Sequence, residues 1–275
     1  MKKIINLLII LLLVAPAAYA EVQLEKLLVS TPNYYGETHD FRPELGTYEY
    51  EVSWSGISAA NVFLTVNKSG ANYDVSTKVK TYSGVDIFYK LRYEAFGKIS
   101  GVDFSPIEST IHQQENSRVK STSLKFSPEG RVRSTHQYKS KIRKFDFNPQ
   151  NPMLDPFSAA FLARSLDWEI GQTRYFDTFN GKSRYLISFS ATDKIKMDVN
   201  GEARDVWVIE PSVKKLNTSK QKNKLRSAKM YVTADEKREI LEIDSEVFVG
   251  SVKTKLVSFT PHQQQTSVAV NYNFQ

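Results

Sequence analysis

The chain contains no cysteine. Disulfide bonds, thiolate nucleophiles and thiolate metal ligands are therefore excluded together. A bacterial lipoprotein is excluded as well, because lipidation requires a cysteine as the first residue of the mature chain. Only four histidines are present, and none has the H-x-H or H-E-x-x-H spacing of a metal site. We expect neither a metal nor another cofactor.

Recognisable catalytic motifs are also lacking. There is no G-x-S-x-G elbow and no glycine-rich phosphate loop. His112 and His136 fall in neighbouring predicted strands and could share a metal, although two unrelated strand histidines are the simpler interpretation. Asp146 and Asp155 could form the carboxylate pair of a glycosidase, but they equally resemble a turn acid and a helix cap. We expect a non-enzymatic protein and keep as an alternative a hydrolase with a dispersed site.

A long apolar run occurs only near the N-terminus, over residues 4–14. Lys2 and Lys3 precede it, and Ala18-Tyr19-Ala20 follows as a small-x-small cleavage site. The run is too short for a permanent transmembrane anchor. We therefore expect a signal peptide over residues 1–20, a mature chain that begins at Glu21, and a periplasmic location.

The charge is moderately basic. Lysine and arginine number 37 against 30 acidic residues, which gives a net charge of +7, and the signal peptide carries two of these charges. Such a surface attracts anionic lipid headgroups and lipopolysaccharide phosphates. It also fits a soluble basic protein with no such partner. Nucleic acid is not an expected partner outside the cytoplasm.

Alternation of apolar and polar residues dominates the chain after residue 46. Tyr48, Tyr50, Val52 and Trp54 share one face of a predicted strand whose other face is polar. Asn180-Gly181 and Asn200-Gly201 favour type I′ hairpins. The pattern predicts an all-β fold of roughly fourteen strands, a large antiparallel, strongly curved sheet or barrel-like meander. Further strands are predicted over 60–66, 73–79, 89–95, 122–126, 132–138, 175–179, 185–189, 195–199, 206–209, 228–233, 240–248 and 252–259.

One short helix interrupts the strands, at about residues 155–166. Asp155 can accept hydrogen bonds from the first-turn amides, and Pro156 suits the first helical position. We expect a leader over 21–45, a single β-rich domain over 46–260 and a tail over 261–275. Residues 211–227 are rich in lysine and are interpreted as an irregular segment.

Three stretches carry a family resemblance: residues 48–57, the helical segment 155–164, and residues 228–256. Together they make the chain resemble the bacterial domain-of-unknown-function 3108 family of exported proteins. The resemblance implies an exported, all-β, barrel-like protein. It implies no activity and no catalytic residues.

The aromatic strand faces suggest a function. They either fill the core of a β-sandwich or line an apolar cavity that binds a lipid or another amphipathic molecule. The candidate lining residues are Tyr50, Trp54, Leu64, Tyr93 and Phe161. The candidate residues for an anionic headgroup, such as that of a lipopolysaccharide-like amphiphile, are Lys214, Lys215, Lys220, Lys222, Lys224 and Arg226.

Two other functions remain open. An envelope assembly module could bind another protein through a sheet edge, with the alternating residues 268–274 as an added strand. An integral outer-membrane barrel is a further alternative, but the many lysines on predicted strands are atypical of faces that meet lipid. We expect an amphiphile binder, with peripheral membrane contact as an additional property.

Overall fold

The structure is a computed structural model that describes residues 41–199, 201–216, 225–247 and 250–262, without the side chains of residues 225 and 226. Its fourteen strands form one antiparallel sheet in the order β8-β7-β6-β5-β4-β3-β2-β1-β14-β13-β12-β11-β10-β9. The all-β prediction is confirmed. Within the described ranges, no helix is long and apolar enough to cross a membrane.

The elements follow one another along the chain with mostly short connections. Their bounds are β1 (Gly46–Trp54), β2 (Ile57–Ser69), β3 (Asn72–Thr81), α1 (Ser83–Asp86), β4 (Leu91–Ser100), β5 (Pro106–Glu115), β6 (Arg118–Phe126), β7 (Val132–Tyr138), β8 (Lys141–Phe147), α2 (Pro156–Ser165), β9 (Thr173–Phe179), β10 (Arg184–Val199), β11 (Glu202–Lys215), β12 (Leu225–Thr233), β13 (Ile240–Val247) and β14 (Ser251–Pro261).

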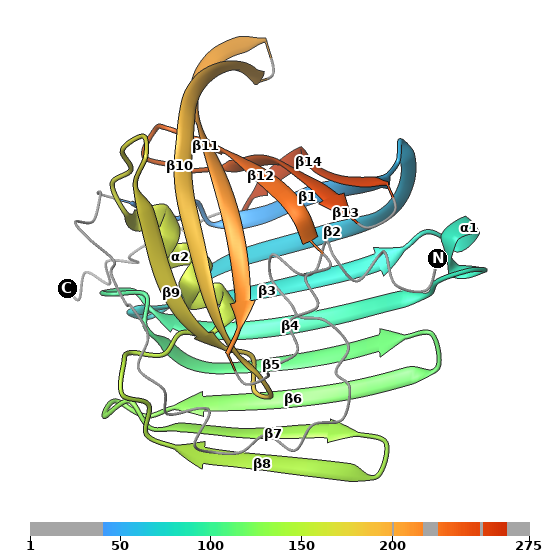
Figure 1. Cartoon of the computed structure of the whole chain (residues 1–275), viewed down its shortest axis with the longest axis vertical. Coiled ribbons are helices and arrows are strands. Elements are labelled where there is room, and N and C mark those ends of the chain that lie inside the picture. The colour runs from blue at the N-terminus through green and yellow to red at the C-terminus, as the bar shows by residue number, and fades with distance from the viewer. Residues whose placement is uncertain (1–40, 200, 217–224, 248–249, 263–275) are drawn as a thin grey trace, which may run out of the picture.

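The sheet curls until its two ends face each other, but it does not close through hydrogen bonds. In Figure 1, β3 to β8 lie nearly horizontal and β9 to β11 stand upright in front of them. Phe179 at the end of β9 packs edge-on against Phe145 and Phe147 of β8, with ring centroids 5.9 and 5.3 Å apart. Ser134 Oγ of β7 donates to the carbonyl of Gly181 at 2.8 Å. Side chains and the β9–β10 turn therefore join the two ends.

Helix α2 lies inside this curve, against β4 and β9. Asp155 caps it, since its Oδ1 accepts from the Ser158 amide at 2.7 Å, and Pro156 occupies the first turn. Phe157 packs directly on Gly97 of β4, where an added Cβ would lie 2.5 Å from the phenyl ring. The helix predicted at 155–166 is confirmed, and its burial makes it the inner layer of the fold.

Several local predictions were wrong. Strand β8 and the short helix α1 were not predicted, and the strand expected at His112, which is β5, was given no bounds. The segment 211–227 is partly regular because β11 extends to Lys215 and β12 begins at Leu225. The Asn180-Gly181 turn is not type I′, since only Gly181 has a positive φ, 84°. Asn180 instead accepts amide hydrogen bonds from Lys182 and Ser183 through its own side chain, at 3.2 and 2.8 Å. This local side-chain bonding competes with the two-residue turn.

The ends of the predicted domain also differ from expectation. Phe41, placed in the leader, is buried and stacks near Phe104 and Phe161, with ring centroids 5.7 and 6.2 Å away. The last residues of the leader therefore belong to the main hydrophobic core. The predicted signal peptide and the alternating residues 268–274 lie outside the described residues.

Candidate functional site

An apolar cavity of about 150 Å³ lies between α2 and the inner face of the sheet. Its walls come from β1 to β4, from β10 to β14 and from α2, so segments nearly two hundred residues apart in sequence meet there. The lining residues are Tyr50, Val52, Ala60, Val62, Leu64, Thr77, Val79, Leu91, Tyr93, Phe157, Ala160, Phe161, Ala163, Arg164, Trp168, Phe189, Trp207, Ile209, Met230, Val232, Arg238, Ile240, Ile243 and Thr254.

Four of the five candidate lining residues border this cavity: Tyr50, Leu64, Tyr93 and Phe161. Trp54 is not among the lining residues. The pairing of β1 with β2 shifts register between Val52 and Ser53, which ends the strict alternation of buried positions before Trp54. A bulge of this kind redirects the side chains that follow it. That these residues bind a ligand stays a prediction.

Burial keeps two tyrosines of the cavity wall in their neutral form. Burial raises the pKa of Tyr93 well above its usual value, and burial raises the pKa of Tyr50 as well. Thr77 and Thr254 also line the cavity, and their hydroxyl groups are buried without a hydrogen-bond partner among the described residues. Apart from these residues and Arg164 and Arg238, the wall of the cavity is largely apolar.

Arg164 of α2 fixes the turn that joins β12 to β13. Its Nε donates to the carbonyl of Arg238 at 2.7 Å, and its Nη2 donates to the carbonyl of Lys237 at 3.1 Å. The guanidinium also lies 4.8 Å above the ring of Phe41. These contacts stabilise a buried charge through directed donors and a cation–π interaction. They bring the turn, and Arg238 with it, to the wall of the cavity.

Arg238 is a functional candidate that sequence analysis missed. Its side chain borders the cavity, and the residue is only 4% exposed. Burial lowers the pKa of Arg238, while Asp167 and Asp235 act in the opposite direction. In sequence it stands in the run Glu236-Lys237-Arg238-Glu239, which is typical of a solvated turn, so no local pattern indicates its burial.

The structure describes the side chains of only two of the candidate headgroup residues, and these two lie on opposite faces of one strand. Lys214 is exposed and Lys215 is half-buried on the opposite face of β11. Lys220, Lys222 and Lys224 lie outside the described residues, and the side chain of Arg226 is not described. Of this basic set, the two residues whose side chains the structure describes, Lys214 and Lys215, do not border the cavity.

The two histidines in question lie on opposite faces of the sheet and are separated by β6. His112 is exposed on β5, whereas His136 of β7 is buried and bonds Thr122 through Nδ1 at 2.8 Å. The idea of a shared metal is therefore wrong. In the described part of the chain, no group of three or more acidic and histidine side chains could hold a metal ion.

We predict that His136 makes folding sensitive to acid. Burial lowers the pKa of His136 to about 4, and Lys182, Lys120 and Arg143 act in the same direction. The unfolded value is near 6.5, so the unfolded chain binds more protons between these two pH values. The free energy of unfolding should be greatest above pH 6.5 and fall by roughly 3 kcal/mol toward pH 4.

Urea unfolding at several pH values measures this dependence. His136→Gln should flatten it over that range, while the exposed control His112→Gln should leave it unchanged. An equally steep dependence in His136→Gln would assign the acid sensitivity to other groups.

The chain is similar to a known protein family and to a solved structure. Residues 49–257 match the family described as "Protein of unknown function (DUF3108)". No curated protein matches the chain in sequence. A crystal structure from Brucella abortus, described as a β-barrel-like protein of domain of unknown function DUF1849, is similar with a TM-score of 0.55. The likeness covers 81% of this chain and 99% of that one at 9% identity, so it shows the fold alone. Because the family match spans most of the chain, this protein belongs to the DUF3108 family.

Proposed function

We propose that this is an exported, non-enzymatic envelope protein that binds the hydrocarbon chain of an amphipathic molecule in its cavity. The observation that supports the proposal is the cavity wall, in which aliphatic and aromatic side chains of eight strands and α2 surround an unfilled space. Well-packed protein interiors leave few voids larger than a water molecule. A space of this size and polarity favours a small apolar guest over water.

The volume of the cavity limits the ligand. Sites for drug-sized ligands usually enclose about 300–1,000 Å³, and a dry cavity of about 150 Å³ accommodates a molecule the size of benzene. The cavity of about 150 Å³ therefore suits a segment of a single chain. The several chains of a lipopolysaccharide-like molecule would not fit together, so we propose a single-chain amphiphile.

Calorimetric titration of the full chain with octanol, an uncharged single-chain amphiphile of a size that suits the cavity, tests the proposed function. We expect saturable binding at one site. A linear, non-saturable heat, or no heat of binding at several temperatures, would contradict the proposal.

Assembly through a sheet edge has less support. The edge strand β8 carries exposed Lys141 and Lys144, and charged edge strands discourage pairing with other chains. The other edge strand, β9, is partly covered, because Leu154 forms a parallel bridge with Thr178. Both edges are therefore protected against the addition of a strand.

We further propose a peripheral contact with anionic membranes through one end of the sheet. The turns after β1, β3, β5 and β7 lie at this end (Figure 1). Exposed Arg118, Lys139 and Lys141 supply the charge that anionic lipid attracts. The exposed apolar side chains at or beside these turns are Ile57, Ile87, Phe88, Val119 and Ile142.

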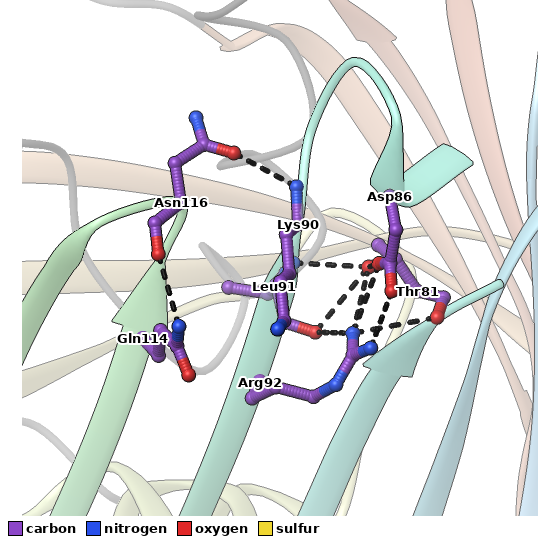
Figure 2. A network of polar contacts seen from close by, with 7 residues as sticks. All are labelled: Thr81, Asp86, Lys90, Leu91, Arg92, Gln114 and Asn116. Carbon is purple, nitrogen blue, oxygen red and sulfur yellow. Dashed lines mark hydrogen bonds and ion pairs between the residues drawn. The ribbon is translucent and has the colours of Figure 1, made fainter. Parts of the chain in front are cut away.

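The turn that carries Ile87 and Phe88 is held in place by a polar network (Figure 2). Arg92 donates hydrogen bonds to Asp86 from both terminal nitrogens. Its Nη1 donates to Asp86 Oδ1 at 3.0 Å, and its Nη2 donates to Oδ2. Thr81 donates to the same carboxylate, and the amide of Lys90 donates to Asn116 Oδ1 at 2.9 Å. The network presents the two exposed apolar side chains in a fixed position.

Phe88→Asp should weaken binding to phosphatidylglycerol vesicles about tenfold, because burying a phenylalanine side chain contributes about 1.5–3 kcal/mol. Cosedimentation with the vesicles measures the effect. The matched control Phe63→Asp changes an exposed phenylalanine in the middle of β2 and should bind as the unmodified protein does. Equal losses in both variants would contradict contact through this end of the sheet.

A further inference from the structure

Arg238 places a guanidinium with unused donors at the wall of an apolar cavity. Its Nε and Nη1 are buried and have no hydrogen-bond partner among the described residues. Its Nη2 lies 3.8 Å from Asp167 Oδ1, and the side chain of Asp167 is 53% exposed. A buried donor without an acceptor is costly, more so when it is charged. These two donors therefore lack the acceptor that would offset the cost of burying them.

Hydrogen bonds on both sides of the turn hold Arg238 in position. Arg164 holds the carbonyls of Lys237 and Arg238, as described above. On the other side of the turn, the amide of Glu239 donates to Thr233 Oγ1 and the amide of Thr233 donates to the Glu239 carbonyl, both at 2.9 Å. The backbone of Arg238 itself has a φ of +48°. The turn is thus anchored at several points, with Arg238 facing inward.

We infer that the ligand of this cavity is a single-chain carboxylate, with its chain among the apolar residues and its carboxylate at Arg238. Guanidinium–carboxylate hydrogen bonds are charge-assisted and shorter than neutral ones. Thr77 and Thr254 also line the cavity, and their hydroxyl groups have no hydrogen-bond partner among the described residues. This inference rests on the proposed function and adds the chemical class of the ligand.

Calorimetric titration of the full chain with octanoate and with octanol, at pH 8 and low ionic strength, separates the contribution of the headgroup to the affinity from that of the chain. We expect octanoate to bind at least tenfold more tightly than octanol. Arg238→Gln should remove this preference and still bind octanol. The control Arg133→Gln alters an arginine whose side chain is 64% exposed on β7, and it should keep the preference.

A measurement on the unmodified protein makes the test independent of how the variant folds. The carboxyl ¹³C shift of labelled octanoate reports its pKa when bound. An apolar cavity alone raises the pKa of a carboxyl group, whereas an adjacent guanidinium lowers it. With Arg164 and Arg238 at the cavity wall and Asp167 and Asp235 near Arg238, we expect the pKa of bound octanoate to fall below that of the free acid.

The outcomes distinguish this inference from the proposed function. Equal affinities for octanoate and octanol, or a raised pKa of bound octanoate, would overturn the role of Arg238 and leave chain binding intact. A protein that binds neither ligand would overturn the proposed function and this inference together.

Discussion

Replacing Arg184 by methionine should lower the free energy of unfolding by about 3–5 kcal/mol. Arg184 and Asp177 are both 0% exposed, and Arg184 Nε donates to Asp177 Oδ1 at 2.8 Å while its Nη2 bonds Oδ2. The two residues join the first residue of β10 to β9, next to the turn where the ends of the sheet meet. Methionine would leave the Asp177 carboxylate buried without this partner.

A surface pair of the same chemistry provides the control. Arg131 also binds Asp146 through two nitrogens, at 2.6 and 3.0 Å, but both side chains are 47% exposed. Exposed ion pairs contribute about 0–1 kcal/mol, so Arg131→Met should have a small effect. Urea unfolding at pH 7 measures both variants. Similar losses in the two would show that burial of the Arg184–Asp177 pair does not determine its contribution.

Replacing Val62 by tryptophan should abolish binding of the amphiphile. Val62 of β2 faces the cavity between Tyr50 of β1 and Val79 of β3, its cross-strand neighbours. The larger indole can extend into the open space, so it occupies the volume that the chain of the ligand needs. Filling an existing void also avoids much of the strain of overpacking. We expect at least a tenfold loss of affinity with a folded protein.

Val257→Trp is the matched control, because Val257 lies on β14 with 53% of its surface exposed and does not line the cavity. Calorimetric titration with octanol measures both variants, and circular dichroism verifies that each is folded. Unchanged affinity in Val62→Trp would place the ligand elsewhere.

Much of the fold follows from alternation in the sequence. Tyr48, Tyr50 and Val52 are buried in turn along β1, as their period of two predicts. Strands β5 and β8 do not show this pattern, because the inner face near them is itself partly polar. Glu115 and His136, for example, are buried on β5 and β7. A strand with polar residues on both faces lacks the alternation from which hydrophobic periodicity predicts a strand.

The candidate site was predicted in part, for a related reason. Tyr50, Leu64 and Tyr93 occupy apolar positions whose face is set by strand alternation, and the structure places all three at the cavity. Trp54 differs because a register shift between Val52 and Ser53 precedes it, and irregular pairing leaves no clear mark in the sequence. Arg238 owes its burial to Arg164, which lies 74 residues earlier. Such a contact depends on the tertiary fold and has no local signal.

The central claim is that the cavity binds a single-chain amphipathic ligand. Native mass spectrometry of the protein, purified gently from the cells that produce it and followed by organic extraction, tests it most directly. The account predicts a discrete bound mass that extracts as a single-chain acid and that is lost from Val62→Trp. A ligand-free mass in repeated preparations, unchanged after addition of octanoate, would contradict it.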